Sequence, residues 1–139
     1  MADIDLRELA TTLDTEDMIG FTRLFVEDIR GGFRSVNLER YPWMEEIGNT
    51  EWKGVLALGM GGSAAGGDFL SALCNLKGKI PVVVQRDYVI PSWWDERWLV
   101  ISTSHSGNTE EAIEATEIAL KAGATVIAVS YTHLTLPTS

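Results

Sequence analysis

The sequence has little cysteine and no long apolar run, and each shortage excludes a class of protein. Its single cysteine, Cys74, permits no internal disulfide, which fits a reducing cytoplasm. No apolar run approaches the ~20 residues that cross a bilayer, so we expect no transmembrane helix and no membrane partner. Residues 1–5 (MADID) are acidic and lack the character of a signal peptide.

Positive charge is also scarce. Eleven lysines and arginines stand against 20 aspartates and glutamates, which gives a formal net charge of −9 over 139 residues. This balance argues against nucleic acid as a partner. It does not exclude a small phosphorylated ligand, because the local dipoles of the backbone can outweigh a distant net charge. We expect neither a metal nor a cofactor.

A glycine-dense stretch, residues 55–67 (VLALGMGGSAAGG), organises the rest of the chain. Its first four residues are apolar and too few for a helix, which predicts a buried parallel strand. The glycines after them allow positive φ angles and the close approach of a ligand. Helical apolar spacing begins at Phe69. A strand, a tight loop and a helix start leave unpaired N–H groups at the loop mouth, where a phosphate can bind.

Three interpretations of this loop compete. Residues 59–64 (GMGGSA) match the dinucleotide fingerprint G-x-G-x-x-G/A, although the acidic residue expected after the second strand is displaced to Asp87. A Walker A loop is excluded because the loop is not completed by Gly-Lys-Ser/Thr. The third interpretation is a tight turn that binds nothing.

Strand-like and helical patterns alternate after this loop. A helix is predicted over residues 110–122, closed by Gly123, and further strands are predicted over 80–84, 98–102 and 124–128. This alternation predicts an α/β fold with a doubly wound parallel sheet, right-handed crossovers and the flavodoxin-like strand order 2-1-3-4-5. Three clustered tryptophans are expected to pack as core or interface: Trp93, Trp94 and Trp98.

The residues before the first strand read as a helical arm. Acidic and hydroxyl residues at 14–17 predict a helix start, and an apolar face then runs from Met18 to Ile29. The helix is expected to end near Gly31 and Gly32. We expect this arm to pack on an α/β domain or to be exchanged between two of them.

A polar loop, residues 103–109 (TSHSGNT), comes after the third predicted strand and opens the next helix. Hydroxyl groups donate hydrogen bonds to a phosphate without adding negative charge, and the helix dipole adds a favourable potential. The structural alternative is capping of that helix by Asn108 or Thr109, but capping needs one such residue where this loop offers five. In the predicted strand order this loop and the glycine loop meet at the switch point, so both should line one pocket. His105 is interpreted as a hydrogen-bonding or surface residue, and no catalytic residue is assigned.

Three segments together resemble the sugar isomerase (SIS) domain, most closely that of the bifunctional phosphoglucose/phosphomannose isomerases. They are residues 59–63, 86–91 (RDYVIP) and 104–111 (SHSGNTEE). The resemblance runs from about Leu13 to Ala128, and the Ser-x-Ser-Gly-Asn-Thr match is its most specific part. His105 differs from the aromatic residue often found at that place.

The resemblance implies a sugar 6-phosphate as ligand. It implies that the phosphate lies on Ser104, Ser106 and Thr109, and that Gly62 and Ser63, with Gly61 beside them, contact the sugar side. The activity it implies is the interconversion of glucose 6-phosphate or mannose 6-phosphate with fructose 6-phosphate through an enediol, in a cytoplasmic homodimer. In the family the glutamate base, a histidine and an arginine lie beyond the position of residue 139, so we expect this chain alone to be inactive.

The resemblance also sets the expected domain organisation. A helical arm occupies residues 1–50, a partial SIS domain occupies 51–128, and residues 129–139 form a non-native tail that resembles a translated sequencing adaptor. The alternative function is a non-catalytic phosphosugar-sensing module of a regulator, which the acidic arm, a poor DNA binder, disfavours. A dinucleotide-dependent oxidoreductase is a more distant alternative.

Overall fold

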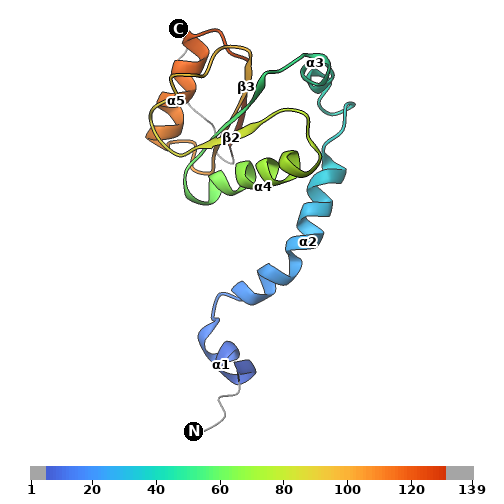
Figure 1. Ribbon diagram of the computed structural model, residues 1–139. Coiled ribbons are helices and arrows are strands. Elements are labelled where there is room, and N and C mark those ends of the chain that lie inside the picture. Colours follow the sequence, from blue (N-terminus) through green and yellow to red (C-terminus); the bar gives the residue numbers. More distant parts are fainter. Residues whose placement is uncertain (1–5, 131–139) are drawn as a thin grey trace. The chain divides into compact units, whose positions relative to one another are not determined.

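A computed structural model describes residues 6–130, which fall into two compact units that divide after Thr50 (Figure 1). The first unit holds three helices: α1 (Leu6–Leu13), α2 (Met18–Ser35) and α3 (Trp43–Asn49). The second holds four strands and two helices: β1 (Gly54–Leu58), α4 (Gly61–Lys77), β2 (Val82–Gln85), β3 (Trp98–Ser104), α5 (Glu110–Lys121) and β4 (Val126–Ser130). Within residues 6–130, no helix is long and apolar enough to cross a membrane.

The start of α2 is set by two acidic side chains. The carboxylates of Asp14 and Asp17 accept hydrogen bonds from N–H groups of the first turn, at 2.7–3.2 Å. The predicted start within residues 14–17 is therefore confirmed. The helix continues through Gly31 and Gly32 to Ser35, beyond the predicted end. A glycine inside a helix costs only about 1 kcal/mol, which is too little to end it.

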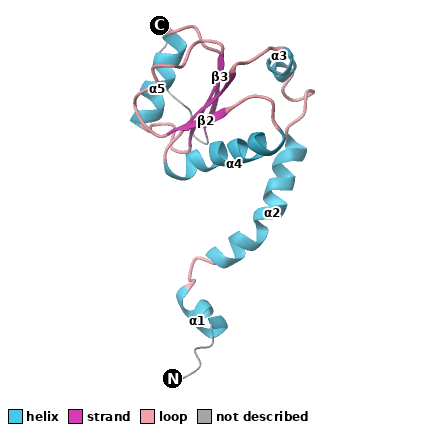
Figure 2. Ribbon diagram, viewed as in Figure 1, coloured by secondary structure: helices cyan, strands magenta, loops and turns pink. Residues whose placement is uncertain are grey.

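All four strands form one parallel sheet in the order β2-β1-β3-β4. The sheet, drawn magenta in Figure 2, lies between helices α4 and α5. This confirms the predicted α/β class and the predicted order of the first four strands. Helix α5 packs against one face of the sheet through Ala115 and Ala119, which join a core with Leu56 and Leu58 of β1. Helix α4 lies on the opposite face, where Gly67 approaches Ala57. Because both faces are covered, every residue of β1 is buried.

Two strands begin two residues later than predicted. β2 begins at Val82, because Pro81 has no N–H and contributes only its carbonyl, which accepts from the Val55 N–H at 2.9 Å. β4 begins at Val126, because the Ala124 N–H is held by the carbonyl of Ala119 at the end of α5, at 3.1 Å.

β4 extends into the predicted tail. Val129 pairs with Thr103 and Ser130 pairs with Ser104, so both are part of the sheet. The predicted fourth strand, residues 124–128, is displaced accordingly, and β3 runs on to Ser104. The rest of the predicted tail, residues 131–139, lies outside the described residues.

Two of the three clustered tryptophans belong to the core. Trp98 is buried and Trp94 packs against the same cluster, as predicted. The ring of Trp93 lies 5.0 Å from that of Trp98, centroid to centroid, and Trp93 is half exposed.

A pair of adjacent glycines in α4 tests the packing of this helix on the sheet. A Cβ at Gly67 would lie 2.9 Å from the Cβ of Ala57 and 3.3 Å from the γ carbons of Val84. We expect Gly67→Ala to lower the free energy of unfolding by about 1–2 kcal/mol, because overpacking outweighs the gain in helix propensity. A Cβ at Gly66 meets nothing within 4 Å, so Gly66→Ala should raise that free energy by up to about 1 kcal/mol. Urea unfolding compares the two, and equal effects would contradict this packing.

Candidate functional site

The glycine loop joins β1 to α4 at the carboxyl end of the sheet. Gly61, the first residue of α4, has φ of 51°, a conformation that favours glycine. A Cβ at Gly59 would lie 3.1 Å from the carbonyl oxygen of Thr103, so glycine lets the loop approach β3 closely. The N-cap residue Met60 makes no side-chain hydrogen bond to the helix. The side chain of its N-cap residue therefore leaves the first N–H groups of α4 uncapped.

The hydroxyl loop joins β3 to α5 and holds a network of side-chain oxygens. Ser104 is buried, and its Oγ accepts from the Gly107 N–H and donates to Thr109 Oγ1, both at 3.1 Å. Ser106 Oγ lies 3.2 Å from the same Thr109 oxygen. Gly107 turns the loop with φ of 69°. The three hydroxyls that the sequence nominates for a phosphate are thus linked to one another.

Thr109 also bears on the capping alternative. It is the N-cap residue of α5, yet its side chain makes no capping hydrogen bond. Its hydroxyl is directed to Ser104 and Ser106 instead. The capping alternative predicted from the sequence therefore does not describe the side chain of Thr109.

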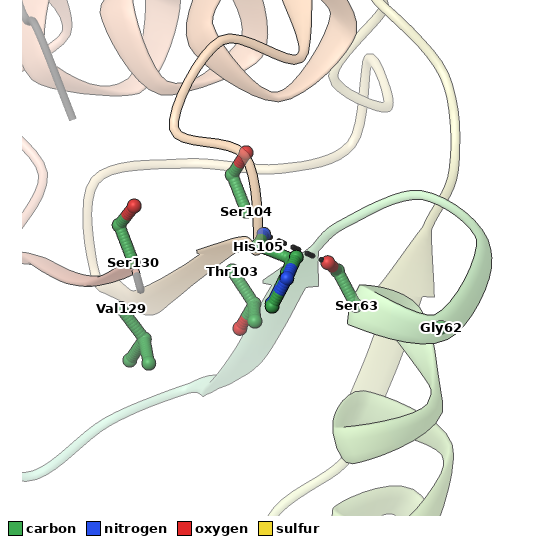
Figure 3. A pocket seen from close by; sticks show the side chains of 7 residues that line it. All are labelled: Gly62, Ser63, Thr103, Ser104, His105, Val129 and Ser130. Atoms are coloured by element: carbon green, nitrogen blue, oxygen red, sulfur yellow. Dashed lines mark hydrogen bonds between the residues drawn. The ribbon is translucent and has the colours of Figure 1, made fainter. Parts of the chain in front are cut away.

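The two loops are joined by one hydrogen bond. The backbone N–H of His105 donates to Ser63 Oγ at 3.1 Å, across the gap between β3 and α4 (Figure 3). Both loops line one cavity of about 570 Å³. The side chains and backbone that line it belong to α4, β3, the hydroxyl loop and β4: Gly62, Ser63, Thr103, Ser104, His105, Val129 and Ser130.

Three of the six predicted site residues line this cavity: Gly62, Ser63 and Ser104. The other three, Gly61, Ser106 and Thr109, lie in the same two loops but are not among the lining residues. The sequence missed Val129 and Ser130, which it assigned to the tail. The predicted strand order could have revealed them, because the carboxyl end of a fourth parallel strand lies beside the carboxyl end of the third.

The described side chains that line the cavity carry almost no charge. Among the described residues that line it there is no Asp, Glu, Lys or Arg. Within residues 6–130, no group of three or more His, Cys, Asp or Glu could hold a metal ion. Hydroxyls and helix N-termini without charged side chains favour an anion such as a phosphate.

A buried polar pair supports the hydroxyl loop from below. Thr116 of α5 lies 2.7 Å from Ser102 of β3, oxygen to oxygen, and also hydrogen-bonds the carbonyl of Ala112. Both Ser102 and Thr116 are fully buried. Ser102 lies two residues before Ser104, on the same face of β3, so this pair ties α5 to the strand directly beneath the loop.

The segment 86–91 contacts both helices that begin near the cavity. Arg86 forms an ion pair with Asp68 of α4. Desolvation, together with the nearby carboxylate of Glu111 in the first turn of α5, raises the pKa of Tyr88. The segment thus holds α4 and α5 without lining the cavity.

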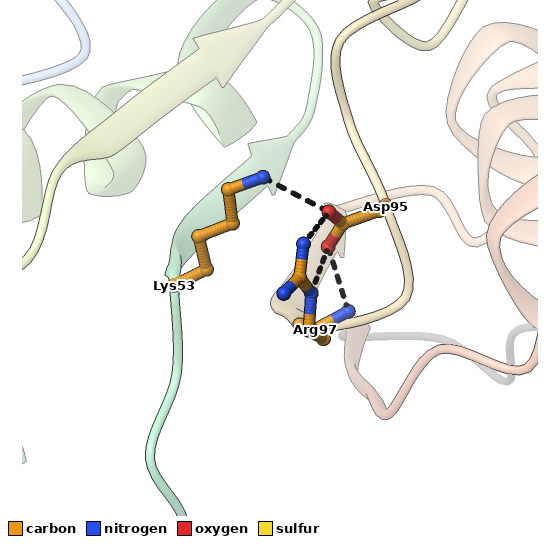
Figure 4. A network of polar contacts seen from close by, with 3 residues as sticks. All are labelled: Lys53, Asp95 and Arg97. Atoms are coloured by element: carbon orange, nitrogen blue, oxygen red, sulfur yellow. Dashed lines mark hydrogen bonds and ion pairs between the residues drawn. The ribbon is translucent and has the colours of Figure 1, made fainter.

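A second polar cluster lies at the amino ends of the two central strands (Figure 4). Asp95 accepts from Lys53 Nζ at 2.9 Å and from the Arg97 guanidinium at 2.6 Å. Hydrogen bonds from Arg97, and then from Lys53, hold the pKa of the Asp95 carboxyl well below its usual range. Lys53 and Arg97 immediately precede β1 and β3, so this cluster joins the starts of the two central strands and is remote from the loops.

The structure defines a doubly wound α/β domain with a cavity at the carboxyl ends of its strands, and comparisons with known proteins agree on the class of protein. No protein-family model matches the chain. Over 76 residues, 55% of the chain, it is 49% identical to the bifunctional phosphoglucose/phosphomannose isomerase of Caldicellulosiruptor bescii. Over 76 residues it is 42% identical to the protein of that name from Thermoplasma acidophilum. The predicted resemblance is confirmed, and the matches span only 22% and 24% of these relatives' own lengths.

A solved structure supports the fold. A candidate phosphosugar isomerase from Salmonella typhimurium LT2 superposes with a TM-score of 0.55 at 23% identity. The superposition covers 64% of this chain and 28% of that one. At this identity the likeness speaks to the fold alone.

Proposed function

We propose that this chain supplies the phosphosugar-binding part of an aldose–ketose isomerase. The reaction is the interconversion of glucose 6-phosphate or mannose 6-phosphate with fructose 6-phosphate. The observation that carries the proposal is the linked hydroxyls of Ser104, Ser106 and Thr109 at the start of α5, beside a cavity shared with the start of α4. The similarity to the named isomerases favours a phosphosugar over other anions.

The proposed roles match the chemistry of each loop. Ser104, Ser106 and Thr109 donate hydrogen bonds to the phosphate, and the N-terminus of α5 adds a favourable potential. Gly61, Gly62 and Ser63 contact the sugar side, where the lack of Cβ atoms at the two glycines leaves room for the ligand. A volume of about 570 Å³ suits a small-molecule ligand.

The proposal assigns substrate binding, not proton transfer, to the described residues. Aldose–ketose isomerisation needs a general base of tuned pKa within reach of the substrate. Among the described residues that line the cavity there is no carboxylate. The homodimer and the cytoplasmic location stay predictions.

Isothermal titration of the full chain with fructose 6-phosphate and with fructose tests the proposal. The two sugars differ only in the phosphate, so fructose is the matched control. We expect fructose 6-phosphate to bind at least about tenfold more tightly, because the phosphate gains charge-assisted hydrogen bonds. Equal affinities would remove the phosphate assignment, and tight binding of NAD instead would favour the dinucleotide interpretation.

A further inference from the structure

A buried polar pair interrupts the apolar contact between α5 and the sheet. The core around it is apolar and includes Leu56, Leu58, Val100, Ala115 and Ala119. Ser102 of β3 and Thr116 of α5 have no exposed surface, and their side-chain oxygens lie 2.7 Å apart. The Thr116 hydroxyl also hydrogen-bonds the carbonyl of Ala112, near the start of α5. Apolar packing is non-directional, whereas a satisfied buried hydrogen bond specifies one arrangement of the helix on the strand.

A second pair of the same kind holds the hydroxyl loop. Ser104 comes two residues after Ser102 and so lies on the same face of β3. Its Oγ donates to Thr109 Oγ1 and accepts from the Gly107 N–H, both at 3.1 Å. Thr109 precedes Thr116 by seven residues, close to two turns of helix, so both hydroxyls lie on the side of α5 that faces the strand. Two serine–threonine pairs thus join β3 to the first half of α5, one at the loop and one beneath it.

We propose that Ser102 and Thr116 are positioning residues, which hold the start of α5 where the hydroxyl loop can bind a phosphate. This inference rests on the proposed function of the cavity. Neither residue lines the cavity, so its effect on binding passes through the loop. Binding groups have to be held within about 0.5 Å of their productive positions. A displaced α5 would move Thr109 Oγ1 away from Ser104, and the turn at Gly107 would loosen.

Three variants of the full chain separate positioning from stability, with fructose 6-phosphate as the probe. Thr116→Val keeps the shape of the side chain and removes its hydroxyl. The double variant Ser102→Ala/Thr116→Val replaces both hydroxyls by apolar groups, which commonly restores the stability that a single replacement loses. We expect both variants to bind the probe roughly three- to tenfold more weakly. Thr116→Ser retains the hydroxyl and should bind within about twofold of the unmodified chain.

Exchange of the Gly107 amide proton reports on the loop without a ligand. We expect exchange to be roughly three- to tenfold faster in Thr116→Val and in the double variant, because the N–H held by Ser104 Oγ opens more often. Ala119→Gly is the matched control in the same helix. It removes a buried methyl group from α5 and lowers stability without touching either hydroxyl pair. This variant should keep both the affinity and the Gly107 exchange rate of the unmodified chain.

The outcomes separate this inference from the proposed function. A double variant that is stable and binds the probe as tightly as the unmodified chain would overturn the positioning role, while the proposed function stands. Equal losses of affinity in Ala119→Gly and Thr116→Val would also overturn it, because any weakening of α5 would then have the same effect. If the unmodified chain does not bind fructose 6-phosphate, the proposed function fails and the positioning role fails with it.

Discussion

Replacing Ser104 with alanine is expected to weaken binding of fructose 6-phosphate by roughly 10- to 100-fold, the effect of losing a hydrogen bond to a charged group. The Ser104 hydroxyl is one of the three proposed phosphate donors. It also accepts from the Gly107 N–H and donates to Thr109 Oγ1, at 3.1 Å each, so its removal loosens the loop as well as deleting a donor. Thr109→Ala removes the partner hydroxyl and should weaken binding to a similar degree.

Ser71→Ala is the matched control for these variants. The Ser71 hydroxyl donates to the carbonyl of Val82 at 3.1 Å, on the flank of α4 that faces β2, and the residue does not line the cavity. This variant should bind fructose 6-phosphate as the unmodified chain does. Calorimetry gives the affinities, and thermal melting confirms that each variant is folded. If Ser104→Ala and Thr109→Ala are folded and bind with unchanged affinity, the phosphate is not held by this loop.

The sheet and the two loops could be predicted because their signals are local. Residues 55–58 are a short apolar run before glycines, and residues 103–109 concentrate hydroxyls before a helix start. The rule that ligands bind where strand order reverses then brings the loops together without knowledge of any distance. In this chain the hydrogen bond from the His105 N–H to Ser63 Oγ joins the two loops, as that rule predicts.

The orientation of individual hydroxyls could not be predicted. Gly107 turns the chain through a positive φ, so Ser106 and Thr109 bond to each other while Ser104 reaches the cavity lining. Spacing in the sequence does not distinguish these cases. The Ser102–Thr116 pair also could not be predicted from the sequence, because it joins residues 14 apart that meet only when α5 packs on β3.

The end of β4 was missed for a different reason. The sequence groups Val129 and Ser130 with the tail because residues 129–139 together resemble a translated sequencing adaptor. Yet β3 continues to Ser104, and a strand of that length offers pairing groups to the residues beside it. Backbone pairing thus extends the strand regardless of where the tail sequence came from, and it brings both residues to the cavity.

The largest loss of stability is expected from Gly54→Ala, at about 3 kcal/mol of unfolding free energy, the upper part of the range for overpacking a core. Gly54 begins β1 and lies directly opposite Trp98 in the register of β1 and β3. A Cβ at Gly54 would lie 2.3–2.7 Å from three carbons of the Trp98 ring. That ring is 5% exposed and belongs to the main core cluster, so it has no free space to move into.

A double-mutant cycle with Trp98→Leu assigns the cause. Leucine removes the ring that the new methyl group would strike, so Gly54→Ala should cost less than about 1 kcal/mol in that background. Trp98→Leu itself is destabilising, because it deletes buried aromatic surface, and the cycle subtracts this effect. Urea unfolding of the four proteins measures the coupling. The same cost for Gly54→Ala in both backgrounds would show that contact with the indole is not what requires glycine here, and that the requirement lies in the backbone of the strand.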